Sequence, residues 1–123
     1  MKPTLASVTP LLPSGPDYDG ELRIYTEQMG FSIVWQMDGM AGIQRDGVSF
    51  NLQRNNTQAW LENASMSIGV KDLGALHAEY KNVPGRVTPI EMRPWGRREF
   101  HIVMPSGVCF QFYEAPEGDL NAA

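Results

Sequence analysis

The sequence predicts an α+β fold in which a β-α-β-β-β unit occurs twice. The segment Gly-Val-Ser-Phe-Asn-Leu at residues 47–52 returns as Gly-Val-Cys-Phe-Gln-Phe at residues 107–112. Each copy follows a turn signal and alternates apolar with polar side chains, which is typical of a strand with one buried face. In each half, a segment of helical pattern precedes these strands. A duplicated module explains the repetition.

The first unit begins with a strand and a helix. Residues 7–12 predict a short strand that is interrupted by Pro10. Asp17 or Asp19 can cap a helix that runs to about Gln28.

Three further strands complete the first unit. Two Asp-Gly pairs separate alternating segments, and this dipeptide is a strong signal for a two-residue hairpin. The pattern therefore predicts a meander of strands at residues 32–37, 40–45 and 48–53.

The second unit repeats this order. A strand is expected at 65–70, then a helix from Lys71-Asp72 to about Lys81, one short strand within 86–92, and a hairpin of 97–103 and 108–114. Residues 54–64 are expected to link the two units. The whole chain, 1–123, is predicted to form a single domain made of two repeats, at about 5–54 and 64–115.

Strand alternation predicts which side chains face away from the core. On the strands at 48–53, 65–70 and 108–114 the outward residues are Ser49, Asn51, Gln53, Ser65, Ser67, Gly69, Cys109, Gln111 and Tyr113. If this polar second face curls into a trough, it forms a ligand site. The alternative is a solvated sheet face, which is common in antiparallel sheets. Periodicity alone leaves both open.

Composition excludes several functional classes. The formal net charge is −4 in 123 residues, whereas a nucleic-acid-binding protein would show a basic stripe. No apolar run approaches the length of a membrane span. Cys109 is the single cysteine and the N-terminus lacks a secretion signal, so a cytoplasmic location is expected.

Three segments resemble a known superfamily. They are residues 24–31, with Tyr25 and Gly30-Phe31; residues 41–46; and residues 94–100, Pro-Trp-Gly-Arg-Arg-Glu-Phe. Together with the duplicated unit, they resemble the vicinal oxygen chelate superfamily over roughly residues 8–115. Within it the chain is most similar to the bleomycin resistance proteins. The resemblance implies the glyoxalase/bleomycin resistance fold with a curved mixed sheet, and a homodimer in which both chains build each trough. It leaves open whether the N-terminal arm is exchanged.

The metal chemistry of this superfamily is not expected here. By resemblance, the four ligand positions are Val8 or Thr9, Asn51, Ser65 and Gln111, and none is a histidine or a carboxylate. Amide and hydroxyl oxygens alone bind divalent metals weakly. We therefore expect no metal, no cofactor and no enzymatic activity.

No other catalytic set replaces the metal site. His77 is expected on a helix surface, His101 is alone on its strand, and Cys109 has no histidine partner at a recognisable position.

Aromatic and amide side chains are the chemistry that remains on the predicted trough. The resemblance implies that Trp35, Met40 and Trp95 line a groove that holds the flat rings of a drug without chemistry on it. The predicted ligand-binding residues are Trp35, Met40, Asn51, Gln53, Trp60, Trp95, Gln111 and Tyr113. The predicted function is sequestration of a planar or cationic aromatic compound, as in bleomycin resistance. The alternatives are a metal-dependent enzyme of the glyoxalase or dioxygenase type and a regulatory ligand-binding module.

Overall fold

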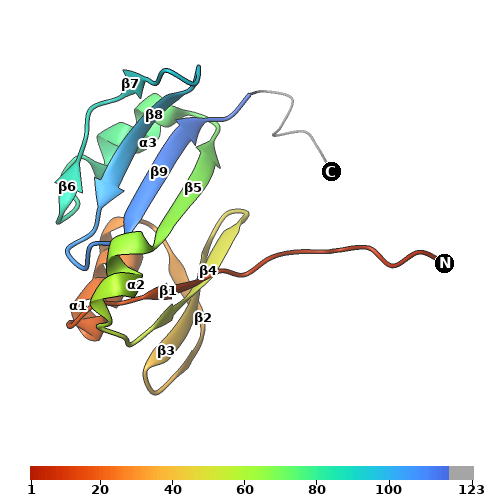
Figure 1. Ribbon diagram of the computed structural model, residues 1–123, viewed down its shortest axis with the longest axis vertical. Coiled ribbons are helices and arrows are strands. Elements are labelled where there is room, and N and C mark those ends of the chain that lie inside the picture. The colour runs from red at the N-terminus through yellow and green to blue at the C-terminus, as the bar shows by residue number, and fades with distance from the viewer. Residues whose placement is uncertain (117–123) are drawn as a thin grey trace.

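The first repeat has the predicted β-α-β-β-β order. The computed structural model describes residues 1–116, so residues 117–123 of the predicted domain lie outside the described part (Figure 1). The elements are β1 (Leu11–Pro13), α1 (Tyr18–Arg23) with a π-helical continuation (Ile24–Gln28), β2 (Ser32–Met37), β3 (Met40–Arg45) and β4 (Val48–Gln53). Asp17 caps α1 by accepting a hydrogen bond from the Gly20 amide. The bounds of the three meander strands are confirmed.

The first strand is shorter than predicted, and the prediction of residues 7–12 was wrong. Only Leu11–Pro13 pairs, in parallel, with Asn51–Gln53 of β4. The backbone N–H of Asn51 donates to the Pro10 carbonyl at 2.8 Å, but Pro10 has no backbone N–H with which to donate a hydrogen bond to β4. Before this residue the chain leaves the sheet and extends away from the body of the molecule (Figure 1), with Leu5 and Val8 exposed.

The segment between the repeats contains a helix that the sequence analysis missed. After α2 (Gln58–Asn63) come β5 (Ser65–Val70), α3 (Leu73–Tyr80), β6 (Arg86–Val87), β7 (Glu91–Met92), β8 (Arg98–Val103) and β9 (Cys109–Glu114). Two short strands replace the one predicted within 86–92. No helix in residues 1–116 is long and apolar enough to cross a membrane.

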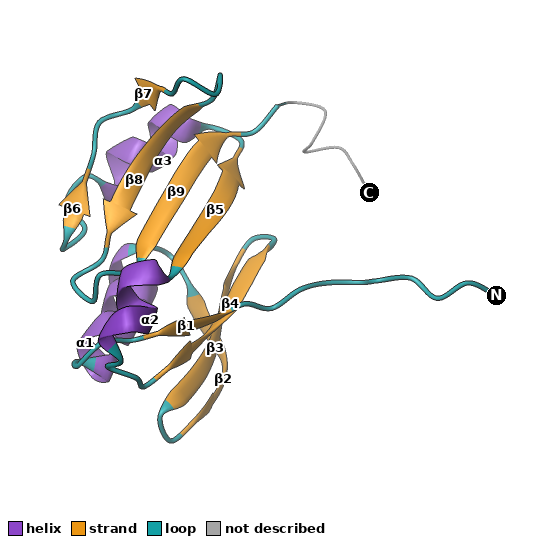
Figure 2. Ribbon diagram, viewed as in Figure 1, coloured by secondary structure: helices purple, strands orange, loops and turns teal. Residues whose placement is uncertain are grey.

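The strands form two mixed sheets, one from each repeat. The first has the order β1-β4-β3-β2, and the second has the order β5-β9-β8-β6, with β7 also pairing with β8. In each, the first strand of the repeat runs parallel to the last, and the other pairs are antiparallel. Figure 2 shows α3 behind the second sheet, which leaves the other face of that sheet without a helix.

Both repeats contribute to one aromatic core. The Tyr25 ring meets Phe50 of its own repeat at 5.2 Å and Phe110 of the other at 5.8 Å, edge to face. Phe50 and Phe110 lie 5.9 Å apart, and all three are at most 1% exposed. Burying each such ring stabilises the fold by roughly 1.5–3 kcal/mol. The faces of β4 and β9 that point away from this core are the predicted polar ones.

Candidate functional site

The pairing of β2, β3 and β4 places four of the predicted groove residues on one face of the first sheet. Trp35 of β2 lies opposite Gly42 of β3, which lies opposite Asn51 of β4. In the next row Met40 lies opposite Gln53. The alternate residues Ala41 and Leu52, by contrast, are fully buried in the core. Trp35, Met40, Asn51 and Gln53 therefore share the face away from the core, which we call the first open face.

A β-bulge places Trp35 on this face. The pairing of β2 with β3 shifts between Ile33, which lies opposite the buried Ile43, and Trp35, which lies opposite Gly42. Without the extra residue Val34, Trp35 would share the core-side face of Ile33. The Trp35 indole covers Gly42 so closely that a Cβ at that position would overlap its Nε1.

The second sheet has a corresponding second open face. One row contains Ser67, Gln111 and His101, and the next contains Gly69, Tyr113 and Glu99. Ser67 Oγ donates to Gln111 Oε1 at 2.7 Å, so the amide has a fixed orientation. Gln111 and Tyr113 are half-buried, whereas the alternate residues Phe110 and Phe112 are in the core.

A buried carboxylate organises this second open face. The Glu99 side chain is 2% exposed and accepts hydrogen bonds from Trp95 Nε1 at 3.4 Å and Arg97 Nε at 3.4 Å. His101 Nε2 lies 2.8 Å from it, and Arg93 Nε lies 3.7 Å away as an ion pair. Burial by itself raises the pKa of Glu99, but the hydrogen bonds from His101, Trp95 and Arg97 outweigh it and lower the pKa below its ordinary value. Glu99 is therefore an anion surrounded by donors.

The turn before β8 carries an aromatic and cationic surface. Trp95 is 64% exposed although its indole nitrogen is bonded to Glu99. The Arg97 guanidinium carbon lies 3.7 Å from the centre of the Tyr113 ring. Trp95 and Arg97 thus share the Glu99 carboxylate, and Arg97 contacts the Tyr113 ring of the second open face.

The predicted site residues therefore divide into three places. Trp35, Met40, Asn51 and Gln53 are on the first open face, and Trp95, Gln111 and Tyr113 are on the second. Trp60 lies on α2, not in a loop, and packs half-buried against the core.

Sequence reasoning missed the roles of Glu99, Arg97 and His101. Their spacing of two residues does indicate a shared strand face, opposite Gln111 and Tyr113. The hydrogen bonds of Glu99 also depend on the turn that returns Trp95 over β8, and no spacing predicts this.

The structure offers poor donors at the positions that the sequence resemblance assigns to metal ligands. Thr9 and Val8 are in the exposed arm, Asn51 is on the first sheet, and Gln111 Oε1 already accepts from Ser67. Within residues 1–116 there is no group of three histidine, cysteine or acidic side chains that could hold a metal ion. These neutral donors do not fit a tight divalent site.

Cys109 and His77 are not arranged for nucleophilic catalysis. Burial raises the pKa of the Cys109 thiol, which disfavours the reactive thiolate. His77 Nε2 lies 3.0 Å from the Thr88 carbonyl, and the ring packs edge-on against Phe100. His77 is thus a packing residue of α3.

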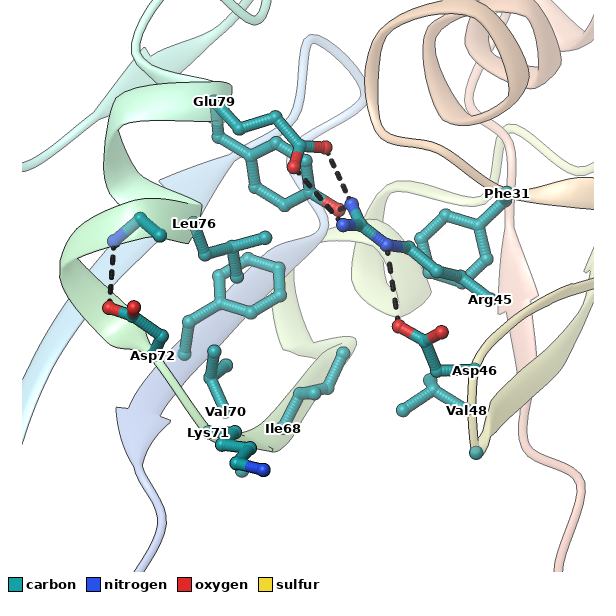
Figure 3. Close-up of a pocket in the computed structure, with 15 residues that line it drawn as sticks. Phe31, Arg45, Asp46, Val48, Ile68, Val70, Lys71, Asp72, Leu76 and Glu79 are labelled. Atoms are coloured by element: carbon teal, nitrogen blue, oxygen red, sulfur yellow. Dashed lines mark hydrogen bonds and ion pairs between the residues drawn. The ribbon is translucent and has the colours of Figure 1, made fainter.

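A cavity of about 740 Å³ lies between the repeats, away from the predicted groove residues. Figure 3 shows its apolar walls, which include Phe31, Val48, Ile68, Val70 and Leu76. At its rim, Arg45 Nη2 donates to Glu79 at 3.1 Å and Nη1 donates to Tyr80 Oη at 2.9 Å. This cluster joins the β3–β4 turn of one repeat to α3 of the other.

Solved structures with this fold include antibiotic-binding proteins and an enzyme. A bleomycin-binding protein from Streptomyces verticillus, complexed with copper(II)-bleomycin, is 24% identical with a TM-score of 0.82, covering 94% of this chain and 100% of that one. A bleomycin resistance determinant encoded on the transposon Tn5 is 24% identical with a TM-score of 0.78, covering 89% and 98%. A lactoylglutathione lyase from Agrobacterium tumefaciens is 15% identical with a TM-score of 0.72, covering 92% and 96%.

At the level of sequence, no protein-family model matches this chain, and neither does any curated protein. Fold alone does not define function, because ligand binding and catalysis both occur on this scaffold. The structural likenesses confirm the predicted architecture: the chain has the glyoxalase/bleomycin resistance fold.

Proposed function

We propose that this chain is a non-catalytic binding protein that sequesters a planar aromatic compound, in the manner of bleomycin resistance. The observation that supports it most is the pair of open faces, each with one accessible indole next to neutral amides. Trp35 is 38% exposed and shares a row of the first sheet with Gly42 and Asn51. Trp95 is 64% exposed and lies at the second sheet, which contains Gln111. Such indoles stack on flat rings, and the amides supply hydrogen bonds.

The proposed groove keeps seven of the eight predicted residues. They are Trp35, Met40, Asn51, Gln53, Trp95, Gln111 and Tyr113; Trp60 is left out because it packs against the core. The two open faces belong to different sheets, and we propose that a homodimer pairs the first face of one protomer with the second face of its partner. In β9 all six residues pair with β5, whereas in β4 only Asn51–Gln53 pair with β1. The backbone of residues 48–50 is thus available to an arm from a second copy.

Tryptophan fluorescence tests the function. Bleomycin and a panel of flat aromatic compounds should change the emission of the wild-type chain, because a stacked ring alters the surroundings of Trp35 and Trp95. The Trp60→Phe variant keeps both open-face indoles and should respond as the wild type does. The Trp35→Phe/Trp95→Phe double variant should lose the response. An unchanged wild-type emission with every compound would contradict sequestration of an aromatic ligand.

A divalent-metal titration separates this function from the enzymes of the same fold. A ligand that binds only the folded state raises the melting temperature by mass action. Zn²⁺, Ni²⁺, Mn²⁺ and Fe²⁺ should leave the melting temperature unchanged. A clear rise with one of them would favour the metal-dependent enzyme instead, and light scattering that shows a monomer at micromolar concentration would contradict the shared groove.

A further inference from the structure

The chain as a whole is acidic, but its two open faces offer no free carboxylate among the described residues. The chain carries a formal net charge of −4. On the first open face, however, the strand pairing of β2, β3 and β4 places only neutral side chains. They are Ser32, Trp35, Met37, Met40, Gln44, Ser49, Asn51 and Gln53. Among the residues of this face that the structure describes, a cationic ligand would find no carboxylate.

The carboxylates of the second open face are already paired. Glu99 is 2% exposed and is surrounded by Trp95, Arg97, His101 and Arg93. Glu91, opposite Glu99 in the register, pairs with Arg93 Nη1 at 3.4 Å. Drawing the buried Glu99 carboxylate to a cation would leave its donors without a partner, which is costly.

Arg97, by contrast, has unused donors. Only its Nε bonds to Glu99, and its two terminal nitrogens make no hydrogen bond within residues 1–116. The side chain is 37% exposed, and its guanidinium carbon lies 3.7 Å from the centre of the Tyr113 ring. A guanidinium fixed in this way presents a planar pair of donors that matches a carboxylate.

We infer that the groove selects a planar aromatic compound bearing an anionic group, such as an aromatic carboxylate, over an aromatic cation. The ring stacks on Trp95 while the carboxylate meets the terminal nitrogens of Arg97. The net charge of −4 opposes this weakly, because salt screens distant surface charges beyond about 8 Å at physiological ionic strength. This inference rests on the proposed function and assigns the chemical class of its ligand.

Three naphthalene probes of similar size test the inference: anionic 2-naphthoate, neutral 2-naphthamide and cationic 2-naphthylmethylammonium. Each is titrated into full-length protein labelled with ¹⁵N, and the three indole N–H signals are followed by NMR. We expect 2-naphthoate to bind about tenfold more tightly than the ammonium probe, which corresponds to about 1.4 kcal/mol. The Trp95 signal should shift most.

Variants assign the preference to Arg97. Arg97→Gln should remove the preference for 2-naphthoate over neutral 2-naphthamide, while Arg97→Lys should keep part of the preference. Arg23→Gln, an exposed arginine on α1, is the matched control and should bind like the wild type. An Arg97→Gln variant that keeps the wild-type preference for 2-naphthoate would overturn the inference.

The outcomes also separate the inference from the proposed function. Equal affinity for the three probes, or preference for the ammonium probe, would overturn the inference and leave the aromatic groove standing. If none of the three shifts an indole signal, the aromatic groove itself is refuted and the inference falls with it.

Discussion

Each repeat buries one glutamate, and the two differ in what surrounds them. Glu21 of α1 in the first repeat is 3% exposed, and Glu99 of β8 in the second is 1% exposed. Both side chains are shielded from direct contact with water, but the first is beside a single hydroxyl and the second is among four nitrogen donors.

Glu21 lies where the two repeats contact each other. Ser106, in the β8–β9 turn, donates its hydroxyl to Glu21 Oε2 at 2.5 Å. Burial raises the pKa of Glu21 to about 7, an effect that the hydrogen bonds from Ser106 reduce and the charge of Asp17 increases. At neutral pH this carboxyl is therefore close to its titration midpoint.

The comparison teaches that burial alone does not set the charge of a carboxyl. Glu99 stays ionised because His101, Trp95 and Arg97 bond to its charged form, whereas Glu21 has only Ser106 and favours protonation. The two residues consequently have different roles. Glu21 connects the repeats, and Glu99 orients the side chains of the second open face.

The largest expected effect is a pH dependence of stability caused by Glu21. In the unfolded chain this carboxyl ionises near pH 4.5, but in the folded chain it ionises near pH 7. Its contribution is therefore complete below pH 4.5 and is lost as the pH rises through 7, by up to about 3 kcal/mol. Urea denaturation between pH 4.5 and 8 should show this decline.

Glu21→Gln should flatten that decline, because the amide still accepts from Ser106 and does not titrate. Glu27→Gln, an exposed residue on the same helical segment, is the control and should keep the wild-type pH dependence. A wild-type stability that is constant from pH 4.5 to 8 would contradict the role given to Glu21.

Glu99 should behave in the opposite sense. Glu99→Gln leaves Arg97 without its anionic partner and Arg93 with Glu91 alone, and should lower the free energy of unfolding by about 2 kcal/mol at pH 7. Since the pKa of Glu99 is lowered, its contribution is present above the ordinary value of 4.5 and is lost as the pH falls below it. Denaturation of the variant at pH 7 measures the loss. Glu91→Gln, whose carboxylate is 54% exposed, should change stability little, and an equal loss in both variants would argue against a special role for Glu99.

Each repeat also places one tryptophan on its open face, and the two indoles are held in position by different contacts. Trp95 is bonded to Glu99, and Trp35 rests on Gly42. Trp95→Ala should weaken a planar aromatic ligand roughly thirtyfold, since losing a stacked anchor costs about 2 kcal/mol. Calorimetric titration measures this change. The fold should remain intact because the side chain is 64% exposed, and Trp95→Phe should recover part of the affinity.

The sequence predicted the strands of both repeats well where tight turns define them. The Asp-Gly pairs gave the bounds of β2, β3 and β4, because such turns fix the register of both neighbours. The first strand was misplaced, since only the structure shows that pairing starts at the Pro10 carbonyl. The short helix α2 has too few residues for a helical period to be recognised.

The candidate site was predictable in part. Alternation assigned Asn51 and Gln111 to faces away from the core, which the register confirms. It could not assign Trp35, because the bulge at Val34 reverses the face that simple alternation gives. The Glu99 cluster depends on tertiary contacts from the turn that precedes β8, so residue spacing alone did not reveal it.

The smallest expected effect tests how Trp35 is supported. A Cβ at Gly42 would overlap the Trp35 indole, so Gly42→Ala should push the ring from its position on the first open face. Because β2 is an exposed edge strand, the ring can move at little cost in stability, and the change should appear in binding. We expect an affinity about fivefold weaker for the aromatic ligand, close to 1 kcal/mol, when titrated by calorimetry. Gly47→Ala is the matched control, since a Cβ there meets no atom within 4 Å. Equal affinity of the Gly42→Ala and Gly47→Ala variants would show that the position of Trp35 over Gly42 does not contribute to binding, and would leave Trp95 as the principal aromatic anchor.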